Sequence, residues 1–131
     1  MFMYYLFVFI GGFLGSISRN LVGNMIQPLS SGFPLQTFFI NCIGSFFLGA
    51  FLPFAKIRLK PEYSLLIGTG FTGAFTTFST FSLENVLLMN EKQFFVSFLY
   101  IFFSMFVGIF LSYSGYKLTD QFHKKEGAST S

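Results

Sequence analysis

Glycine, threonine and serine crowd into residues 68–81, which read Gly-Thr-Gly-Phe-Thr-Gly-Ala-Phe-Thr-Thr-Phe-Ser-Thr-Phe within an apolar part of the chain. Glycine and hydroxyl side chains weaken a helix, because glycine adds backbone freedom and hydroxyls compete for backbone hydrogen bonds. Inside a membrane a helix break is tolerated only where protein, water or an ion satisfies the freed backbone groups. We therefore predict a helix broken within the membrane, with an ion site or pathway beside the break.

The broken segment carries groups that suit ions of both signs. Backbone carbonyls freed around Gly73 and Thr76 are hard oxygen ligands, which suit a small cation such as sodium. Phe78 and Phe81 are three residues apart and project from nearly one face of the following helix. Because an aromatic ring has a positive edge, these rings can attract an anion without a formal charge. The break can thus hold a cation structurally while its rings face an anion.

Two stripes of small and polar residues accompany this segment, each with a spacing of four. The first consists of Thr37, Asn41, Ser45 and Gly49, and the second of Tyr100, Ser104, Gly108, Ser112 and Tyr116. Such a set winds along one side of a helix. Hydroxyl and amide groups without a full charge suit a small anion that is partly dehydrated but never trapped. Close helix packing also explains Thr37, Ser45 and Gly49. A bond to the carbonyl one turn back explains any single serine or threonine more simply than pore lining does.

Three polar residues need their own explanation. A primary amide loses much hydration in hydrocarbon, so Asn41 either ties helices together or donates to something polar that passes it. Arg19 either extends to the membrane interface or lies at an aqueous vestibule, where it concentrates anions. Glu84 is the only acidic residue well inside an expected helix, and we place it at a wet helix end or in a hydrogen bond within a dimer.

The composition requires a membrane around these residues. The 131-residue chain is 53% hydrophobic and only 10% charged, which predicts an all-α integral membrane protein with a single domain over residues 1–131. Residues 2–25, 33–55, 64–90 and 94–117 can each cross a hydrocarbon core of about 30 Å. A polar tail, residues 118–131, follows and is expected to fray. His123 and Cys42 have no ligand-spaced partners, so neither an enzyme nor a metal cluster of side chains is expected.

The basic residues predict an orientation. Six lie on one side of the expected helices, namely Lys56, Arg58, Lys60, Lys117, Lys124 and Lys125. Only Lys92 lies in a connection on the other side. The positive-inside rule therefore predicts that both termini are in the cytoplasm.

These motifs resemble those of the Fluc (CrcB) family of fluoride channels. The resemblance rests on residues 11–19 (Gly-Gly-Phe-Leu-Gly-Ser-Ile-Ser-Arg), residues 37–45 (Thr-Phe-Phe-Ile-Asn-Cys-Ile-Gly-Ser) and residues 70–81 (Gly-Phe-Thr-Gly-Ala-Phe-Thr-Thr-Phe-Ser-Thr-Phe). It extends over nearly the whole chain. The third motif is very specific, whereas the first alone is weak.

The resemblance implies a bacterial plasma membrane channel for passive export of fluoride, which gives fluoride resistance. It also implies four helices per subunit, an antiparallel dimer, and a structural sodium ion on the two-fold axis held by carbonyls of Gly73 and Thr76. The family's ion pathway corresponds here to Asn41, Phe78, Phe81, Tyr100 and Ser104, joined by Thr37, Ser79 and Thr80.

Some features leave alternatives open. A homodimer inserted in both orientations needs a weak charge bias, so the six-to-one asymmetry keeps a heterodimer with a paralogous subunit of opposite orientation in view. At Gly108 a hydroxyl would have extended the polar stripe. A small multidrug transporter has a similar architecture, but it usually carries a carboxylate in the first helix, and residues 2–25 have none. A non-transporting assembly subunit explains the glycines but not the hydroxyls beside a break.

Overall fold

The structure is a computed structural model that describes residues 1–129, and every regular element in this part of the chain is helical. Three helices are uninterrupted: α1 (Phe2–Met25), α2 (Leu35–Arg58) and α6 (Phe94–Ser129). The remaining segment is divided into α3 (Pro61–Ser64), the π-helix η1 (Leu65–Thr72), α4 (Gly73–Phe75) and α5 (Phe78–Asn90). The prediction of an all-helical chain with one broken helix is confirmed.

Three stretches are long and apolar enough to cross a membrane: α1, α2 and the part of α6 from Phe94 to Lys125. Large apolar side chains on these helices face outward, as in Phe9 (72% exposed) and Phe110 (68% exposed). Apolar surface on this scale suits hydrocarbon rather than water. The chain therefore has the surface of a protein embedded in a bilayer.

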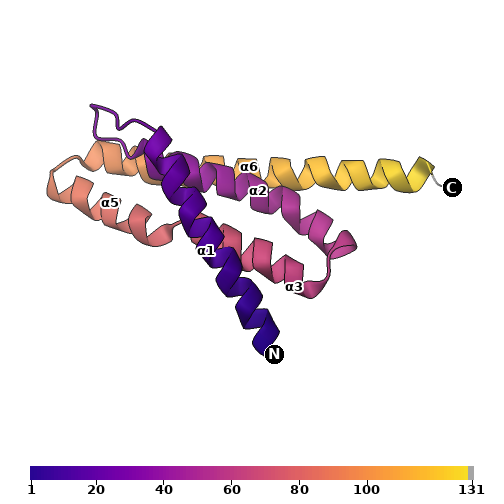
Figure 1. Cartoon of the computed structure of the whole chain (residues 1–131). Helices are drawn as coiled ribbons and strands as arrows, with labels where there is room; N and C mark the ends of the chain where they lie inside the picture. The colour runs from indigo at the N-terminus through magenta and orange to yellow at the C-terminus, as the bar shows by residue number, and fades with distance from the viewer. Residues whose placement is uncertain (130–131) are drawn as a thin grey trace.

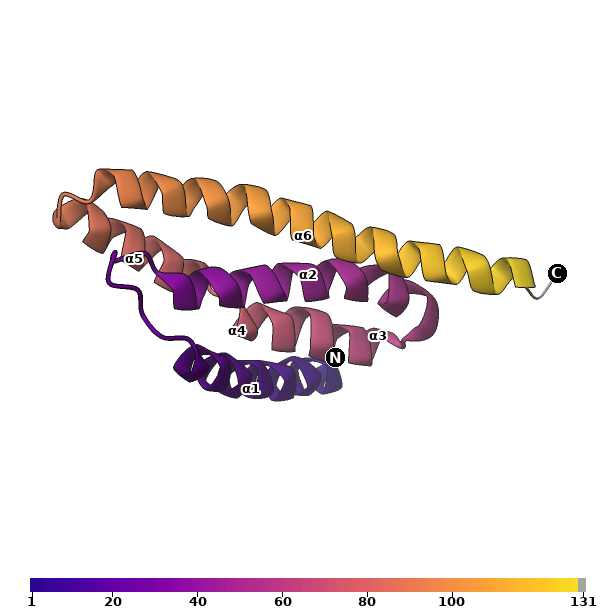
Figure 2. The ribbon, with the colours of Figure 1, turned by 90° about the horizontal axis from the view of Figure 1, so that it is seen from above.

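The helices α2 and α6 lie side by side and run in the same direction, whereas the broken segment runs the opposite way (Figures 1 and 2). Its parts η1 and α4 pack against α1, and α5 packs against α6. Near the end of α2, the ring of Phe54 stacks on His123 of α6 with a centroid separation of 6.2 Å. Near the start of α1, Phe7 packs edge-on against Tyr63 of α3 at 5.7 Å. The first turns of α1, the connection after α2 and the end of α6 therefore lie toward one end of the molecule.

Glycines allow the helix backbones to touch at two contacts. A Cβ atom on Gly15 of α1 would overlap the carbonyl oxygen of Phe71 in η1. A Cβ atom on Gly49 of α2 would overlap the carbonyl oxygen of Ser112 in α6. Small residues permit such approach in membrane helices, so both glycines serve close packing here.

The helix bounds differ from the sequence expectation in three places. Helix α2 covers Leu35–Arg58 rather than residues 33–55, and the broken segment begins at Pro61 rather than at residue 64. Helix α6 continues past residue 117 through most of the expected polar tail. Residues 118–125 contain no glycine or proline, and Asp120 pairs with Lys124 one turn later at 2.9 Å. Polarity ends a membrane span, but it does not end a helix that has good formers and such pairs. Residues 130–131 of that tail lie outside the described part of the chain.

The π-helix η1 was not expected. In a π-helix the backbone N–H groups donate to the carbonyl five residues earlier, which makes the turn wider than that of an α-helix, and such turns often occur at functional sites. The side-chain hydroxyl of Thr72 also donates to the carbonyl of Ile67, at 2.9 Å. The wide turn leads directly into the break.

Candidate functional site

The break in the helix lies at Thr76 and Thr77, between α4 and α5. Thr76 has φ −76° and ψ 158°, and Thr77 has φ −146° and ψ 117°, so both are extended. The hydroxyl of Thr77 then caps α5 by accepting from the backbone N–H of Thr80 at 3.1 Å. Its neighbour Ser79 also lies within hydrogen-bond distance of that hydroxyl, at 3.3 Å. The hydroxyl-rich sequence thus ends one helix and begins the next.

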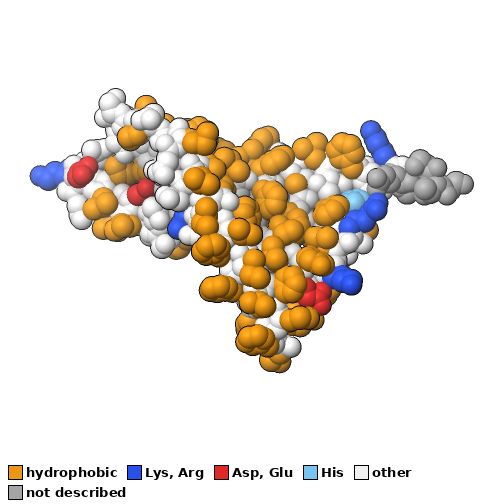
Figure 3. All heavy atoms as spheres, viewed as in Figure 1, with side chains coloured by type: hydrophobic (Ala, Val, Ile, Leu, Met, Phe, Trp, Pro, Cys, Tyr) orange, Lys and Arg blue, Asp and Glu red, His pale blue; other side chains and the backbone are white. Residues whose placement is uncertain are grey.

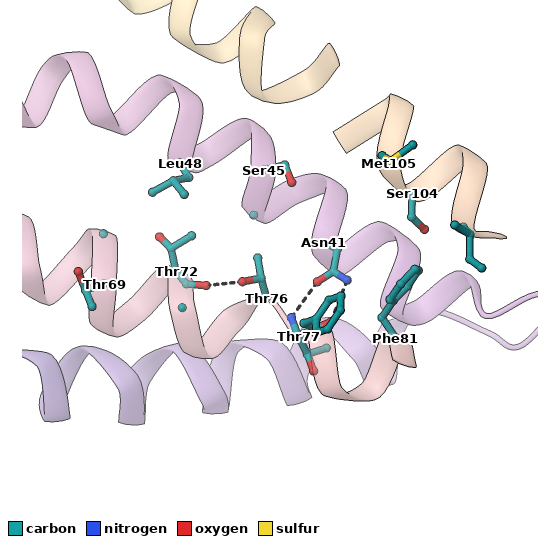
Figure 4. Close-up of a pocket in the computed structure, with 15 residues that line it drawn as sticks. Asn41, Ser45, Leu48, Thr69, Thr72, Thr76, Thr77, Phe81, Ser104 and Met105 are labelled. Atoms are coloured by element: carbon teal, nitrogen blue, oxygen red, sulfur yellow. Dashed lines mark hydrogen bonds between the residues drawn. The ribbon is translucent and has the colours of Figure 1, made fainter. Parts of the chain in front are cut away.

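Asn41 of α2 satisfies the exposed backbone at the break. Its Nδ2 donates to the carbonyl of Thr77 at 3.1 Å, and its Oδ1 accepts from the backbone N–H of the same residue at 2.8 Å (Figure 4). Of the two interpretations left open for Asn41, the structure contains the tie between helices. An amide nitrogen carries two N–H groups, so one donor remains for a second partner.

Two carbonyls at the break lose the donors that a continuous helix would give them. In an α-helix the N–H of Thr77 would donate to Gly73, but here it donates to Asn41. The N–H of Thr80 would donate to Thr76, but here it donates to the hydroxyl of Thr77. Beside Gly73 there is open space, since no atom lies within 4 Å of where its Cβ would be. The carbonyls of Gly73 and Thr76 are therefore available for another ligand.

Glu84 of α5 accepts two hydroxyl groups from neighbouring helices. Thr37 of α2 donates to Oε1, and Tyr100 of α6 donates to Oε2, both at 2.8 Å. Both donors are buried, with Tyr100 0% exposed. Hydrogen bonds to a carboxylate are roughly twice as strong as neutral ones, so this cluster ties three helices together. It unites three residues that sequence analysis had assigned to separate elements.

Three aromatic rings continue from this cluster toward the break. Phe81 lies 4.9 Å from Tyr100 and 5.9 Å from Phe78, measured between ring centroids. Phe78 is 80% exposed, whereas Phe81 is half-buried. The expected common face of the two phenylalanines is therefore present, with one ring inside the chain and the other directed outward.

A cavity of about 680 Å³ collects six of the twelve site residues expected from the sequence. Asn41 and the break form one wall, and Ser104 projects into the same space from α6 (Figure 4). The hydroxyl of Ser104 is buried and has no hydrogen-bond partner among the described residues. The other expected residues on this wall are Gly73, Thr76, Phe78 and Phe81.

A second cavity, of about 470 Å³, is lined by Thr37 and Glu84. Arg19 and Thr80 line it with them. Among the side chains that the structure describes, Arg19 has no ion-pair partner, and it is half-buried. A positive guanidinium thus faces a polar space that leads to the Glu84 cluster. Thr80 lies here rather than in the larger cavity.

Sequence analysis missed a second buried pair, Asn85 and Ser97. Ser97 of α6 is 0% exposed and donates to Oδ1 of Asn85 at 2.8 Å, while Nδ2 of Asn85 donates to the carbonyl of Phe81 at 2.9 Å. This chain of bonds holds the helix turn that carries Phe81. The desolvation argument applied to Asn41 would have identified Asn85 as well, because it is also an amide within an apolar segment.

The chain is similar to known proteins over nearly its full length. The family model described as "CrcB-like protein, Camphor Resistance (CrcB)" matches residues 6–116. A fluoride-specific ion channel FluC of Oceanobacillus iheyensis is 46% identical over 123 residues, covering 92% of this chain and 95% of that relative. FluC 1 of Bacillus cereus is 43% identical over 124 residues (92% and 86%), and FluC of Thermus thermophilus is 40% identical over 116 residues (87% and 93%).

Proposed function

This chain belongs to the CrcB family of fluoride channels. We propose that it lets fluoride leave the cytoplasm passively and so confers fluoride resistance. The family consists of ion channels, so the chain is a multi-pass membrane protein and not an enzyme. The observation that carries the proposal is the match to relatives named fluoride-specific ion channels over nine-tenths of the chain. The cavity at the helix break supports it with a suitable lining.

The larger cavity supplies neutral donors for a dehydrated anion. Its polar groups include the unpartnered hydroxyl of Ser104 and the second N–H of Asn41, neither of which carries a charge. The ring edges of Phe78 and Phe81 add a weak positive potential. Fluoride entering this space loses water and gains these donors, and because no Lys or Arg lines the space the ion can leave again.

The Glu84 cluster already uses two of the hydroxyl groups that we expect along the fluoride pathway. The hydroxyls of Thr37 and Tyr100 donate to the carboxylate, so neither proton is available to an anion in this arrangement. Fluoride that reaches Tyr100 must therefore compete with Glu84 for the phenolic proton. Arg19, across the adjacent polar cavity, offsets the repulsion between an anion and the carboxylate.

A structural sodium ion fits the groups present at the break. The carbonyls of Gly73 and Thr76 have lost their helical donors, and Gly73 faces open space. Carbonyl oxygens are preferred by hard cations, and two from each of two subunits would hold sodium at the centre of a dimer. Bound sodium supplies a fixed positive charge and joins the subunits. Replacing sodium by N-methylglucamine during purification is expected to abolish fluoride flux, and undiminished flux would contradict the sodium site.

The proposed active form is an antiparallel dimer, with either a second copy or a paralogous subunit of opposite orientation as partner. The outward position of Phe78 supports a partner, because a ring that is 80% exposed lies at the mouth of a polar cavity. Competing interpretations are weaker. Relatives of a small multidrug transporter or of an assembly subunit would not be named fluoride-specific channels.

The first test is fluoride efflux from liposomes that contain the purified chain alone. A fluoride electrode records the efflux, and a chloride electrode records the control. Fast loss of fluoride without chloride is expected if a second copy is the partner. If the chain alone gives no flux but flux appears when a paralogue is added to the same liposomes, the active form is a heterodimer. Equal loss of chloride would overturn the proposed selectivity.

A further inference from the structure

The two ends of the molecule differ in charge. Six of the eight Lys and Arg residues belong to the end of α2, the connection after it and the C-terminal part of α6, and we call them the basic collar: Lys56, Arg58, Lys60, Lys117, Lys124 and Lys125. The opposite end has Lys92 beside Glu91. Figure 3 shows basic side chains gathered at the end of the molecule that carries the C-terminus.

A contact between α2 and α6 brings the two parts of the basic collar together. The ring of Phe54 stacks on His123, with centroids 6.2 Å apart and an angle of 24° between the planes. Phe54 lies two residues before Lys56, and His123 lies next to Lys124. Lys124 is 76% exposed although it pairs with Asp120. The lysines of both helices thus face solvent at one level of the molecule.

Tyrosines mark this level as a membrane interface. Five of the six tyrosines lie in the first turns of α1, in α3 or in the C-terminal half of α6, and Tyr100, near the start of α6, is the exception. Tyr63 is 50% exposed, Tyr113 60% and Tyr116 49%. The ammonium of Lys117 lies 5.8 Å from the centre of the Tyr113 ring. Tyrosine prefers the headgroup region, where its ring is apolar and its hydroxyl is hydrated.

The length of α6 carries the basic collar through the headgroup region. Its 36 residues extend for about 54 Å at 1.5 Å per residue, whereas the hydrocarbon core is about 30 Å thick. Beyond Lys117, Leu118 and Phe122 are four residues apart and are 49% and 69% exposed. An exposed apolar edge beside lysines is typical of a helix at a membrane surface.

We propose that the basic collar binds the phosphate groups of anionic phospholipids. Lysine ammonium groups and tyrosine hydroxyls both donate to phosphate oxygens, and each basic residue near an anionic surface strengthens binding by roughly a factor of five. This binding holds one end of the subunit at the anionic leaflet and does not depend on fluoride conduction.

Thermal unfolding of the full chain in detergent micelles tests this proposal. Dioleoylphosphatidylglycerol is added as the probe, and dioleoylphosphatidylcholine is the neutral comparison. A ligand that binds only the folded state raises the midpoint, and we expect a rise of roughly 5 °C or more with the anionic lipid alone. Since the attraction is electrostatic, 0.5 M salt is expected to reduce the rise.

Variants locate the site and separate the lipid from free phosphate. A variant with five substitutions in the basic collar is expected to lose most of the rise in midpoint. Its midpoint without lipid should not change, because the five side chains are exposed. The substitutions are Lys56→Gln, Lys60→Gln, Lys117→Gln, Lys124→Gln and Lys125→Gln. The matched control, Lys92→Gln at the other end, is expected to retain the full rise. Equal stabilisation by the neutral lipid, by inorganic phosphate, or in the five-residue variant would overturn the proposal.

Discussion

The two polar stripes, each with a spacing of four, run from the helix break into the groove between α2 and α6. Their side chains have similar chemistry in both regions, but they differ in their hydrogen-bond partners. At the break, Asn41 pairs with Thr77, and Tyr100 donates to Glu84. In the groove, of about 640 Å³, Ser104 has a buried hydroxyl without a partner among the described residues. Ser45, Gly108 and Ser112 line the groove with it.

This difference in hydrogen bonding indicates that the polar stripes have two roles. At the break, the bonds of Asn41 and Thr77 fix the conformation of the chain, and they leave the carbonyls of Gly73 and Thr76 available to an ion. In the groove, the hydroxyl of Ser104 is left for something outside the chain, whether an ion or a partner subunit. Substitutions of the bonded side chains should therefore reduce stability and flux together, whereas a substitution at an open groove position such as Gly108 should change flux alone.

The largest effect is expected for Asn41→Asp. The carboxylate can still accept from the N–H of Thr77, but it would turn a second oxygen toward the Thr77 carbonyl, where Nδ2 now donates at 3.1 Å. Losing this bond and burying a charge should cost about 3 kcal/mol of unfolding free energy and stop most fluoride flux. Unfolding in detergent and liposome efflux measure the two losses.

The control for this substitution is Asn24→Asp, which makes the same chemical change at an exposed position near the end of α1. It should leave both the unfolding midpoint and the flux close to those of the parent chain. Full flux in Asn41→Asp would reduce Asn41 to a packing residue, and an unchanged midpoint would show that its bonds do not hold the break.

A smaller loss is expected for Tyr100→Phe. The ring and its contact with Phe81 remain, but Oε2 of Glu84 loses its donor. A hydrogen bond to a charged group contributes about 2 kcal/mol, so the unfolding free energy should fall by that amount and flux should fall with it. Combining it with Thr37→Val, which removes the other donor, should give a non-additive loss because both hydroxyls share one carboxylate.

The exposed Tyr113→Phe serves as the control for Tyr100→Phe, since Tyr113 is 60% exposed. Its unfolding free energy should not change measurably. Strictly additive losses for Thr37 and Tyr100 would mean that the Glu84 cluster does not act as a unit.

Sequence analysis located the break because its cause is local. The run of glycines and hydroxyls at residues 68–81 disfavours a helix whatever surrounds it, and the structure breaks at Thr76 and Thr77 within that run. The bounds of α1, residues 2–25, also follow from local apolar composition. Such features need no knowledge of neighbouring helices.

Other features depend on contacts that a sequence does not display. The sequence shows that Asn41 is an amide within an apolar segment. Its partner Thr77 lies 36 residues away, and the pairing requires α2 to pack beside the break. The π-helical segment η1 packs closely against α1, a contact that its own residues do not reveal. The bond between Asn85 and Ser97 requires the relative rotation of α5 and α6. Tertiary geometry therefore decided which polar residues were satisfied.

Substituting Phe78 and Phe81 tests whether fluoride passes the aromatic rings beside the helix break. Phe78→Ile and Phe81→Ile should each slow fluoride flux strongly, because isoleucine has no positive ring edge. Stability should change little for Phe78, which is 80% exposed, and by about 1 kcal/mol for Phe81, which loses its contact with Tyr100. Phe110→Ile, at a site that is 68% exposed on α6, is the control. Unchanged flux in both test variants would remove the rings from the mechanism.

The smallest effect on stability is expected for Gly108→Ser, in the groove. A Cβ atom there would lie 3.6 Å from the hydroxyl of Ser45, an ordinary contact, and serine is a better helix former than glycine by about 0.5 kcal/mol. The unfolding midpoint should therefore stay the same or rise slightly, whereas Gly49→Ser, the control, should lower it because its Cβ would overlap the carbonyl of Ser112. If the groove belongs to the fluoride route, the added hydroxyl gives the ion one more donor, and liposome efflux should be at least as fast as in the parent chain. A folded Gly108→Ser variant that conducts poorly would instead mean that the partner subunit, rather than fluoride, occupies the groove.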